Sequence, residues 1–183
     1  MHYHAEVWIP TDEDVHGQVE RALAPYQEGT AEHGFWDWWQ IGGRWKGTHV
    51  PSYDAAEDPE HVELCRLCMG TGMRPGWAWL DDKGDHQFAD AWAKECNGCN
   101  GCRGTGKSLT WPTKWRRHEA DVMAVADVPD DLSAFTLVVG GKVFHEQVWD
   151  YEKSNETPFG TVKGKLAELG IDSGYLVTVD YHC

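Results

Sequence analysis

The two ends of the chain share an alternating pattern of apolar and polar residues. Residues 2–9 turn four side chains to each side, and the second side consists of His2, His4, Glu6 and Trp8. Residues 175–182 repeat the alternation, and there the second side consists of Leu176, Thr178, Asp180 and His182. Because successive side chains of a strand point to opposite faces, both stretches are predicted to be β-strands with one face in the core.

Two helices are predicted between these strands. Pro10 ends the first strand, the run 11–14 supplies a cap and early negative charge, and apolar residues at helical spacing follow as far as Leu23. The second helix covers residues 161–169 and ends at Gly170, because glycine adopts the left-handed backbone that often closes a helix.

A hairpin and a short strand complete the pattern. Residues 135–139 and 142–149 are strand-like, and Gly140–Gly141 between them is typical of a two-residue hairpin turn. Residues 122–126 form a further apolar run. This order of elements favours the α+β class: a mainly antiparallel sheet with two helices on one face, close to a ferredoxin-like arrangement, plus a small insert.

The insert is indicated by the distribution of charge. The whole sequence has a net charge of −14, yet residues 61–107 hold equal numbers of acidic and basic side chains. We therefore predict a core domain made of residues 1–60 and 108–183, with residues 61–107 inserted into it. Because affinity for nucleic acid rests on Lys and Arg, the acidic core disfavours nucleic acid as a partner.

The lack of a recognisable targeting signal and the pattern of cysteines both favour a cytoplasmic location. No apolar run approaches the roughly 20 residues that a membrane helix needs, and residues 1–6 lack the basic and apolar regions of a signal peptide. Six cysteines, five of them close together with CxxC spacing, are typical of metal ligands in a reducing compartment.

The insert contains two copies of one cysteine motif. Residues 65–72 and 99–106 both have the pattern CxxCxGxG. Each CxxC turn brings two thiolates within reach of one ion, and two such turns complete the tetrahedron of ligands that zinc prefers. The glycines permit a positive φ, so that backbone N–H groups can point at the sulfurs. The sequence therefore predicts one structural Zn²⁺ held by Cys65, Cys68, Cys99 and Cys102.

This motif resembles the cysteine-rich zinc domain of DnaJ-type co-chaperones, whose repeat is CxxCxGxG. The resemblance covers residues 65–106 only, and the presence of two repeats instead of four implies one zinc ion instead of two. The His-Pro-Asp tripeptide of the J-domain is absent, so co-chaperone activity is not implied. Cys96 forms a competing pair with Cys99, and its role stays open, although the glycines after Cys102 favour the pair Cys99–Cys102.

Tryptophan is frequent, with eleven residues in the chain, and several of them surround Gly42–Gly43 in the segment 35–45. The stretch Asp37–Trp45 resembles a motif of small uncharacterised proteins from phages of actinobacteria, which also carry a C-terminal Asp-x-His and a mid-chain His after a hairpin turn. Asp180–His182 and His145 occupy those places here. The resemblance implies no established activity, but it implies that 61–107 is an insert into such a scaffold and that a phage-encoded chain works in the host cytosol.

The same segment supplies candidate ligand-binding residues. Glycines let the backbone approach a ligand, Arg44 offers a fork to phosphate or carboxylate, and indoles offer a stacking surface. Together with one histidine of the first strand, the candidates are Trp38, Trp39, Gly42, Gly43, Arg44, Trp45 and His4. The alternative is that these are ordinary core and surface residues.

Three functions follow as hypotheses. The first is a phage-type accessory protein that binds a host protein or a small anionic, nucleotide-like ligand, with zinc in a purely structural role. The second is a metal-dependent hydrolase or phosphodiesterase that uses His145, Asp180 and His182 together with His4 and needs a second metal, whose identity stays unknown. The third is nucleic-acid binding through the insert, in which the basic and aromatic residues are Arg66, Arg74, Arg103, Lys107, Trp77 and Trp79.

Overall fold

The computed structural model describes residues 1–29, 34–73, 79–80, 86–87, 98–110, 120–145 and 159–183. The chain divides into two compact units. The sheet unit comprises Met1–Tyr53 and Thr113–Cys183, and the cysteine unit comprises Asp54–Pro112. The two units are described separately. Neither helix of the described residues combines the length and the apolar character that crossing a membrane requires.

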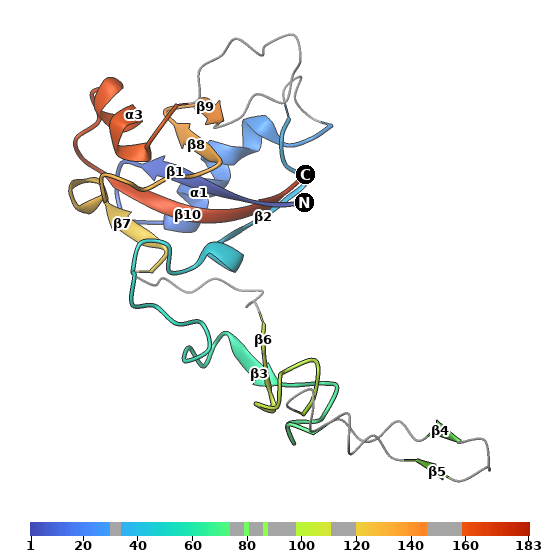
Figure 1. Ribbon diagram of the computed structural model, residues 1–183. Coiled ribbons are helices and arrows are strands. Elements are labelled where there is room, and N and C mark those ends of the chain that lie inside the picture. The colour runs from blue at the N-terminus through green and yellow to red at the C-terminus, as the bar shows by residue number, and fades with distance from the viewer. Residues whose placement is uncertain (30–33, 74–78, 81–85, 88–97, 111–119, 146–158) are drawn as a thin grey trace. The chain divides into compact units, whose positions relative to one another are not determined.

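The sheet unit is built on a six-stranded, mostly antiparallel sheet (Figure 1). Its strands are β1 (His2–Ile9), β2 (Trp38–Ile41), β7 (Val122–Ala124), β8 (Thr136–Val139), β9 (Lys142–His145) and β10 (Tyr175–His182). The order is β2-β10-β1-β8-β9, and β7 pairs with the same strand β10 as β2 does. Only the β1–β8 pair among these is parallel. The predicted α+β class with a mainly antiparallel sheet is confirmed.

The two predicted terminal strands form the centre of this sheet. β1 and β10 pair along their whole length, from His2 opposite His182 to Ile9 opposite Tyr175. The chain ends therefore meet, and the Met1 amino group donates to the Cys183 carbonyl at 2.6 Å. Residues directly opposite one another on paired strands share a face, so the two alternating patterns coincide.

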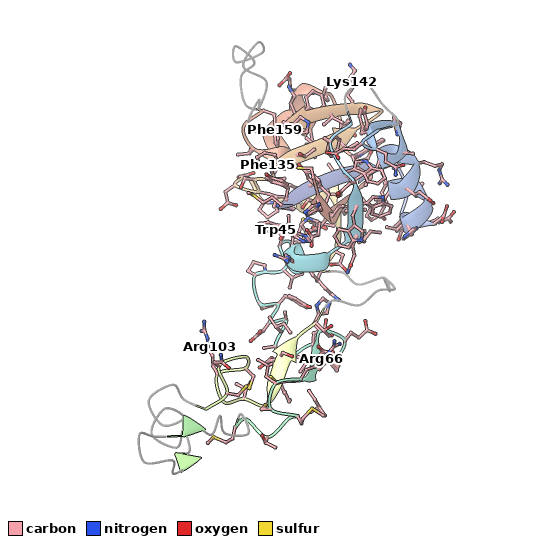
Figure 2. All side chains as sticks on the ribbon, turned by 90° about the vertical axis from the view of Figure 1, so that its right-hand side faces the viewer. Trp45, Arg66, Arg103, Phe135, Lys142 and Phe159 are labelled. Carbon is pink, nitrogen blue, oxygen red and sulfur yellow. The ribbon has the colours of Figure 1, made fainter. Side chains whose placement is uncertain are left out.

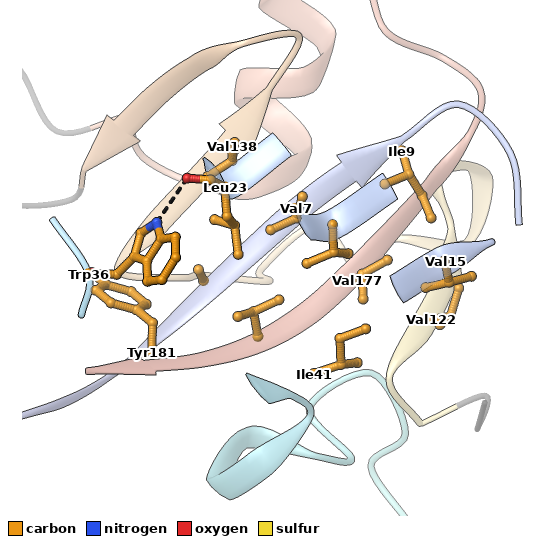
Figure 3. Close-up of a cluster of buried hydrophobic side chains, with 13 residues drawn as sticks. Val7, Ile9, Val15, Leu23, Trp36, Ile41, Val122, Val138, Val177 and Tyr181 are labelled. Atoms are coloured by element: carbon orange, nitrogen blue, oxygen red, sulfur yellow. Dashed lines mark hydrogen bonds between the residues drawn. The ribbon is translucent and has the colours of Figure 1, made fainter. Parts of the chain in front are cut away.

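Two α-helices cover the sheet. α1 (Val15–Leu23) packs Val15, Val19 and Leu23 into the core cluster of Figure 3, where Trp36 Nε1 donates to the Leu23 carbonyl at 2.9 Å. That cluster uses the odd-numbered residues of β1 and β10. Thr161, whose Oγ1 accepts from the Gly164 N–H at 3.2 Å, caps α3 (Val162–Glu168).

The two helices lie on opposite faces, and the prediction that both share one face is wrong in this detail. α3 buries Val162 and Leu166 in a second core cluster with Leu137, Val139 and Leu176. Leu176 is the even-numbered neighbour of Val177, which belongs to the cluster under α1. Because adjacent residues of a strand point to opposite faces, the sheet has a core on each side. Period-two patterns show which residues share a face, but not which helix covers it.

The hairpin of β8 and β9 turns at Gly140 and Gly141, with φ of 55° and 75°, as the two-residue turn requires. The strand order differs from a ferredoxin-like sheet, in which another strand separates the two parallel strands of the βαβ unit. Here β1 and β8 are direct neighbours. The three 3₁₀ turns of the described residues are η1 (Ala24–Tyr26), η2 (Gly43–Trp45) and η3 (Val125–Asp127).

The cysteine unit contains two short antiparallel pairs. β3 (Val62–Leu64) pairs with β6 (Lys107–Leu109), and β4 (Trp79–Leu80) pairs with β5 (His86–Gln87). Cys65 directly follows β3, and Gly106 directly precedes β6. The β3–β6 ladder therefore brings the two ends of the cysteine-rich segment together.

Candidate functional sites

The four predicted zinc ligands converge in the cysteine unit. Cys65, Cys68, Cys99 and Cys102 are all buried, and their sulfurs lie within 4.8 Å of one another. Two of the Sγ–Sγ distances, Cys65–Cys99 and Cys68–Cys102, are 3.8 Å. Zinc–sulfur bonds of about 2.3 Å in a tetrahedron place the sulfurs roughly 3.8 Å apart. The arrangement can hold a metal ion such as zinc.

Two equivalent loops build this cluster, one from each copy of the motif. The Cys65 N–H donates to the Gly106 carbonyl at 2.9 Å, and the Cys99 N–H donates to the Gly72 carbonyl at 2.7 Å. Thr71 Oγ1 donates to the Cys68 carbonyl at 2.7 Å, and Thr105 Oγ1 donates to the Cys102 carbonyl at 2.8 Å. These contacts of one loop have counterparts in the other, as expected of an approximate two-fold axis through the cluster.

The glycines of the motif are required by this close approach. Gly72 and Gly106 have φ of 74° and 75°. A Cβ on Gly106 would collide with the carbonyl oxygen of Gly70, and one on Gly72 would collide with that of Gly104. The Gly106 N–H donates to Cys102 Sγ at 3.2 Å. Burial opposes ionisation of this thiol, but the Gly106 N–H, the neighbouring cysteine thiols and the Gly104 N–H together outweigh it and lower the pKa of Cys102 to about 7.

A second polar cluster occupies the even-numbered face of β1 and β10. Glu6 is fully buried there, and its Oε1 contacts His4 Nε2 at 2.7 Å and His49 Nε2 at 2.9 Å. Thr178 Oγ1 donates to the same oxygen at 3.0 Å. Trp45, labelled on η2 in Figure 2, stacks on His4 with ring centres 5.2 Å apart. The segment from η2 to His49 thus covers this part of the sheet.

The electrostatics of the cluster are those of a buried ion pair. Burial alone raises the pKa of Glu6, but His49 and His4 more than offset it and hold the pKa at about 2. Burial alone lowers the pKa of His49, whereas Glu6, and to a smaller degree Asp121, raises it above its ordinary value. Each of the two groups therefore stabilises the charged form of the other at a site without solvent.

Next to this cluster, two histidine–aspartate pairs lie where the chain ends meet. His2 Nδ1 contacts Asp180 Oδ1 at 2.9 Å, and His182 Nδ1 contacts Asp37 Oδ1 at 2.9 Å. The rings of His2 and His182 are 5.4 Å apart, and Trp38, which is 43% exposed, meets the His2 ring edge-on at 5.7 Å. Sequence periodicity placed Asp180 and His182 on one face. It did not predict that Asp180 contacts His2 or that His182 contacts Asp37.

The two glycines of the Trp/Arg segment approach carboxylates of the protein itself. Gly42 and Gly43 have φ of 71° and 55°, and an added Cβ would lie 2.5 Å from Asp121 Oδ1 and from the Asp180 Cβ, respectively. The Arg44 N–H donates to Asp180 Oδ2 at 3.1 Å, while its side chain is exposed. These contacts account for the glycines without a bound ligand.

His145 does not join Asp180 and His182, and here the predicted constellation is wrong. His145 pairs with Thr136, Thr136 with Ala5, and Ala5 with Val179. Directly opposed residues share a face, so His145 lies on the odd-numbered face, with its Nδ1 2.9 Å from Thr136 Oγ1. Asp180, one residue beyond Val179, lies on the other face.

The remaining candidates are divided in the same way. Trp38 lies opposite His182 and Trp39 opposite Tyr181, so their indoles point to different faces. Trp39 packs against the core under α1, with the His16 ring 5.3 Å away. Sequence reasoning missed His49, because it lies in a turn-rich stretch without the periodicity that assigns a residue to a face. Cys96, Arg74 and Trp77 lie outside the described residues.

Compared with models of known protein families, with curated proteins and with solved structures, the chain shows no significant match. The comparisons therefore lend no support to the resemblance to DnaJ-type zinc domains or to the resemblance to phage proteins.

Proposed function

We propose that this chain is a zinc-stabilised binding protein of the cytoplasm, in which one structural Zn²⁺ occupies the four-cysteine site and the surface around it binds another protein. The observation that carries the proposal is the buried tetrahedral set of sulfurs. Four thiolates fill the coordination sphere of zinc, so no position is left for a water or substrate. The metal then supplies folding energy and not chemistry.

A protein partner is supported by the surface of the cysteine unit. Most of the large apolar side chains that are exposed in the described residues belong to this unit: Leu64, Leu67, Met69, Met73 and Leu109. Met69 is 77% exposed and also has a φ of 53°, a conformation that non-glycine residues rarely adopt. Exposed apolar side chains that gather in one small unit are typical of protein interaction sites.

The other binding hypotheses receive less support. A small anion at Arg44 would approach Asp180, whose carboxylate accepts the Arg44 N–H. For nucleic acid, Arg66 and Arg103, labelled in Figure 2, are exposed basic residues of the cysteine unit, but four thiolates on one Zn²⁺ leave two negative charges beside them. The hydrolase hypothesis is weakened because His145 lies on the face of the sheet opposite to Asp180 and His182. A protein partner is the hypothesis that the geometry supports best, and the resemblance to phage proteins makes a host protein the first one to test.

Native mass spectrometry and affinity capture test the two parts of this proposal. Wild-type protein is expected to carry one zinc ion, and Cys99→Ser to carry none. Capture from host lysate, with the captured protein identified and rebound in purified form, is expected to fail for Leu67→Ser/Met69→Ser. Trp38→Ala is the matched control, because it removes an exposed apolar side chain of the sheet unit. A wild-type chain without zinc, or capture that depends on Trp38 and not on Leu67 and Met69, would contradict the proposal.

A further inference from the structure

Glu6 is the centre of a second donor set that the structural zinc does not explain. We propose that His4, Glu6 and His49 bind a divalent transition-metal ion through two imidazole nitrogens and one carboxylate. Two His and one carboxylate are the ligand set of catalytic zinc sites and of non-haem iron sites. The site is separate from the four cysteines and shares no residue with them.

The geometry of the cluster brings the three donors together. Both imidazoles present Nε2 to one oxygen of Glu6, at 2.7 and 2.9 Å, although His49 lies in a different segment from His4 and Glu6. In the metal-bound form, the ion takes the place of the two N–H hydrogens and each ring carries its proton on Nδ1. Binding also requires the two imidazoles to turn towards each other, so that both Nε2 atoms reach about 2.0–2.2 Å from the ion. Thr178 Oγ1, 3.0 Å from Glu6 Oε1, holds the carboxylate in orientation.

The hydrogen bonding of Glu6 is incomplete without a further ligand. One carboxylate oxygen takes three contacts, while the other, Oε2, is buried and has no hydrogen-bond partner among the described residues. Buried polar atoms are nearly always satisfied, and an orphaned one costs roughly 1–3 kcal/mol. A bidentate bond from Glu6 to a cation uses both oxygens.

The charges around the cluster also favour a cation. Asp121 and Asp180 are buried, with exposed fractions of 0% and 2%, beside the elements that carry Glu6 and His49. Asp180 accepts from the Arg44 N–H, and the Asp121 carbonyl accepts from the Thr178 N–H at 2.9 Å, so both acids are fixed near β10. Imidazoles that bind a metal are neutral, so the buried charges near the ion are the three carboxylates, which favour a dication.

Titration with Co²⁺ and Mn²⁺ of protein whose cysteine site is already loaded with zinc tests the proposal. Isothermal titration is expected to show one further ion per wild-type chain, and Glu6→Gln and His49→Gln are expected to weaken it by at least about tenfold. His145→Gln is the matched control, because it removes an imidazole from the opposite face. If zinc-loaded wild type takes up no further ion, or if Glu6→Gln binds it as tightly as wild type, the proposal is overturned.

Paramagnetic NMR tests the same site in the wild-type protein, so its result does not depend on whether a variant folds. Substoichiometric Mn²⁺ is expected to broaden the imidazole signals of His4 and His49 first and to leave His145 sharp. Broadening that begins at His2 and His182 would instead place the ion at the exposed histidine pair and overturn the assignment to Glu6. No broadening of any histidine would mean that the buried cluster is an ion pair only.

Discussion

Glu6 has no exposed surface, although it is a carboxylate on the central strand β1 of a small acidic protein. Its pairing with His4 and His49 makes the stability of the sheet unit depend on pH. The Glu6 pKa is about 2, against an ordinary value of 4.5, so its stabilising contribution is present above about pH 4.5 and is lost as pH falls towards 2. The pKa of His49 is raised above 6.5, so its contribution is present below pH 6.5 and is lost as pH rises through the raised value.

Glu6→Gln is therefore expected to destabilise the protein most between about pH 4.5 and 6.5, by roughly 3 kcal/mol, because it leaves a buried imidazolium without its counter-charge. The measurement is the free energy of unfolding in urea at several pH values, before any second metal is added. Glu20→Gln, an exposed carboxylate of α1, is the control and should follow the wild-type curve. Parallel curves for wild type and Glu6→Gln would show that the ion pair does not govern the pH dependence.

At the scale of elements, the backbones of the two cysteine loops approach each other closely at two points, Gly72 and Gly106. Only glycine fits there, because a Cβ would collide with a carbonyl oxygen of the other loop. Gly106 and Gly141 have the same φ of 75°. A Cβ on Gly106 collides with the Gly70 carbonyl, whereas one on Gly141, in the β8–β9 turn, meets no atom within 4 Å. The same substitution at the two sites therefore separates backbone strain from steric collision.

Gly106→Ala is expected to lower zinc affinity at least tenfold, because the two loops must move apart and take the sulfurs with them. Gly141→Ala bears the backbone strain alone, about 1–2 kcal/mol, and should leave zinc affinity at the wild-type value. Competition against a chromophoric chelator measures both. Equal zinc affinities for Gly106→Ala and wild type would show that the loops can tolerate the separation.

At the scale of the whole molecule, the two compact units raise the question of whether each depends on the other. The sheet unit has its own two core clusters, and the only core cluster found in the described part of the cysteine unit consists of the four cysteines. Structural zinc contributes an apparent binding free energy of about 10–16 kcal/mol in small zinc domains. We therefore expect the fold of the cysteine unit to depend on a bound metal, and the fold of the sheet unit to depend mainly on its apolar core.

Cys65→Ser is expected to remove the zinc and the order of the cysteine unit while the sheet unit still melts cooperatively. The sheet unit loses little stability, because the entropic cost of closing a loop grows only with the logarithm of its length. A circular dichroism melt with hydrogen exchange measures both units, and Cys183→Ser, which removes an exposed thiol outside the cluster, is the control. If Cys65→Ser shows no cooperative transition, the insert is part of the core.

The sequence by itself determined the two terminal strands, the hairpin turn and the set of four clustered cysteines. β1 and β10 have the bounds that period-two alternation predicts, and the hairpin turns at Gly140–Gly141, because these features are set by neighbouring residues. The four cysteines could be named because two CxxCxGxG loops carry their geometry within themselves.

Only the tertiary structure decided which strands and helices are neighbours and which side chains share a face of the sheet. Strand order, the placement of α1 and α3 on opposite faces, and the separation of His145 from Asp180 depend on pairings between distant segments, which local periodicity does not encode. The burial of Glu6 depends on the segment from η2 to His49 folding over it, and His49 lies 43 residues away in the chain. A period-two pattern reports that Glu6 faces away from the core under α1, but whether that face meets water or a covering loop is decided by packing.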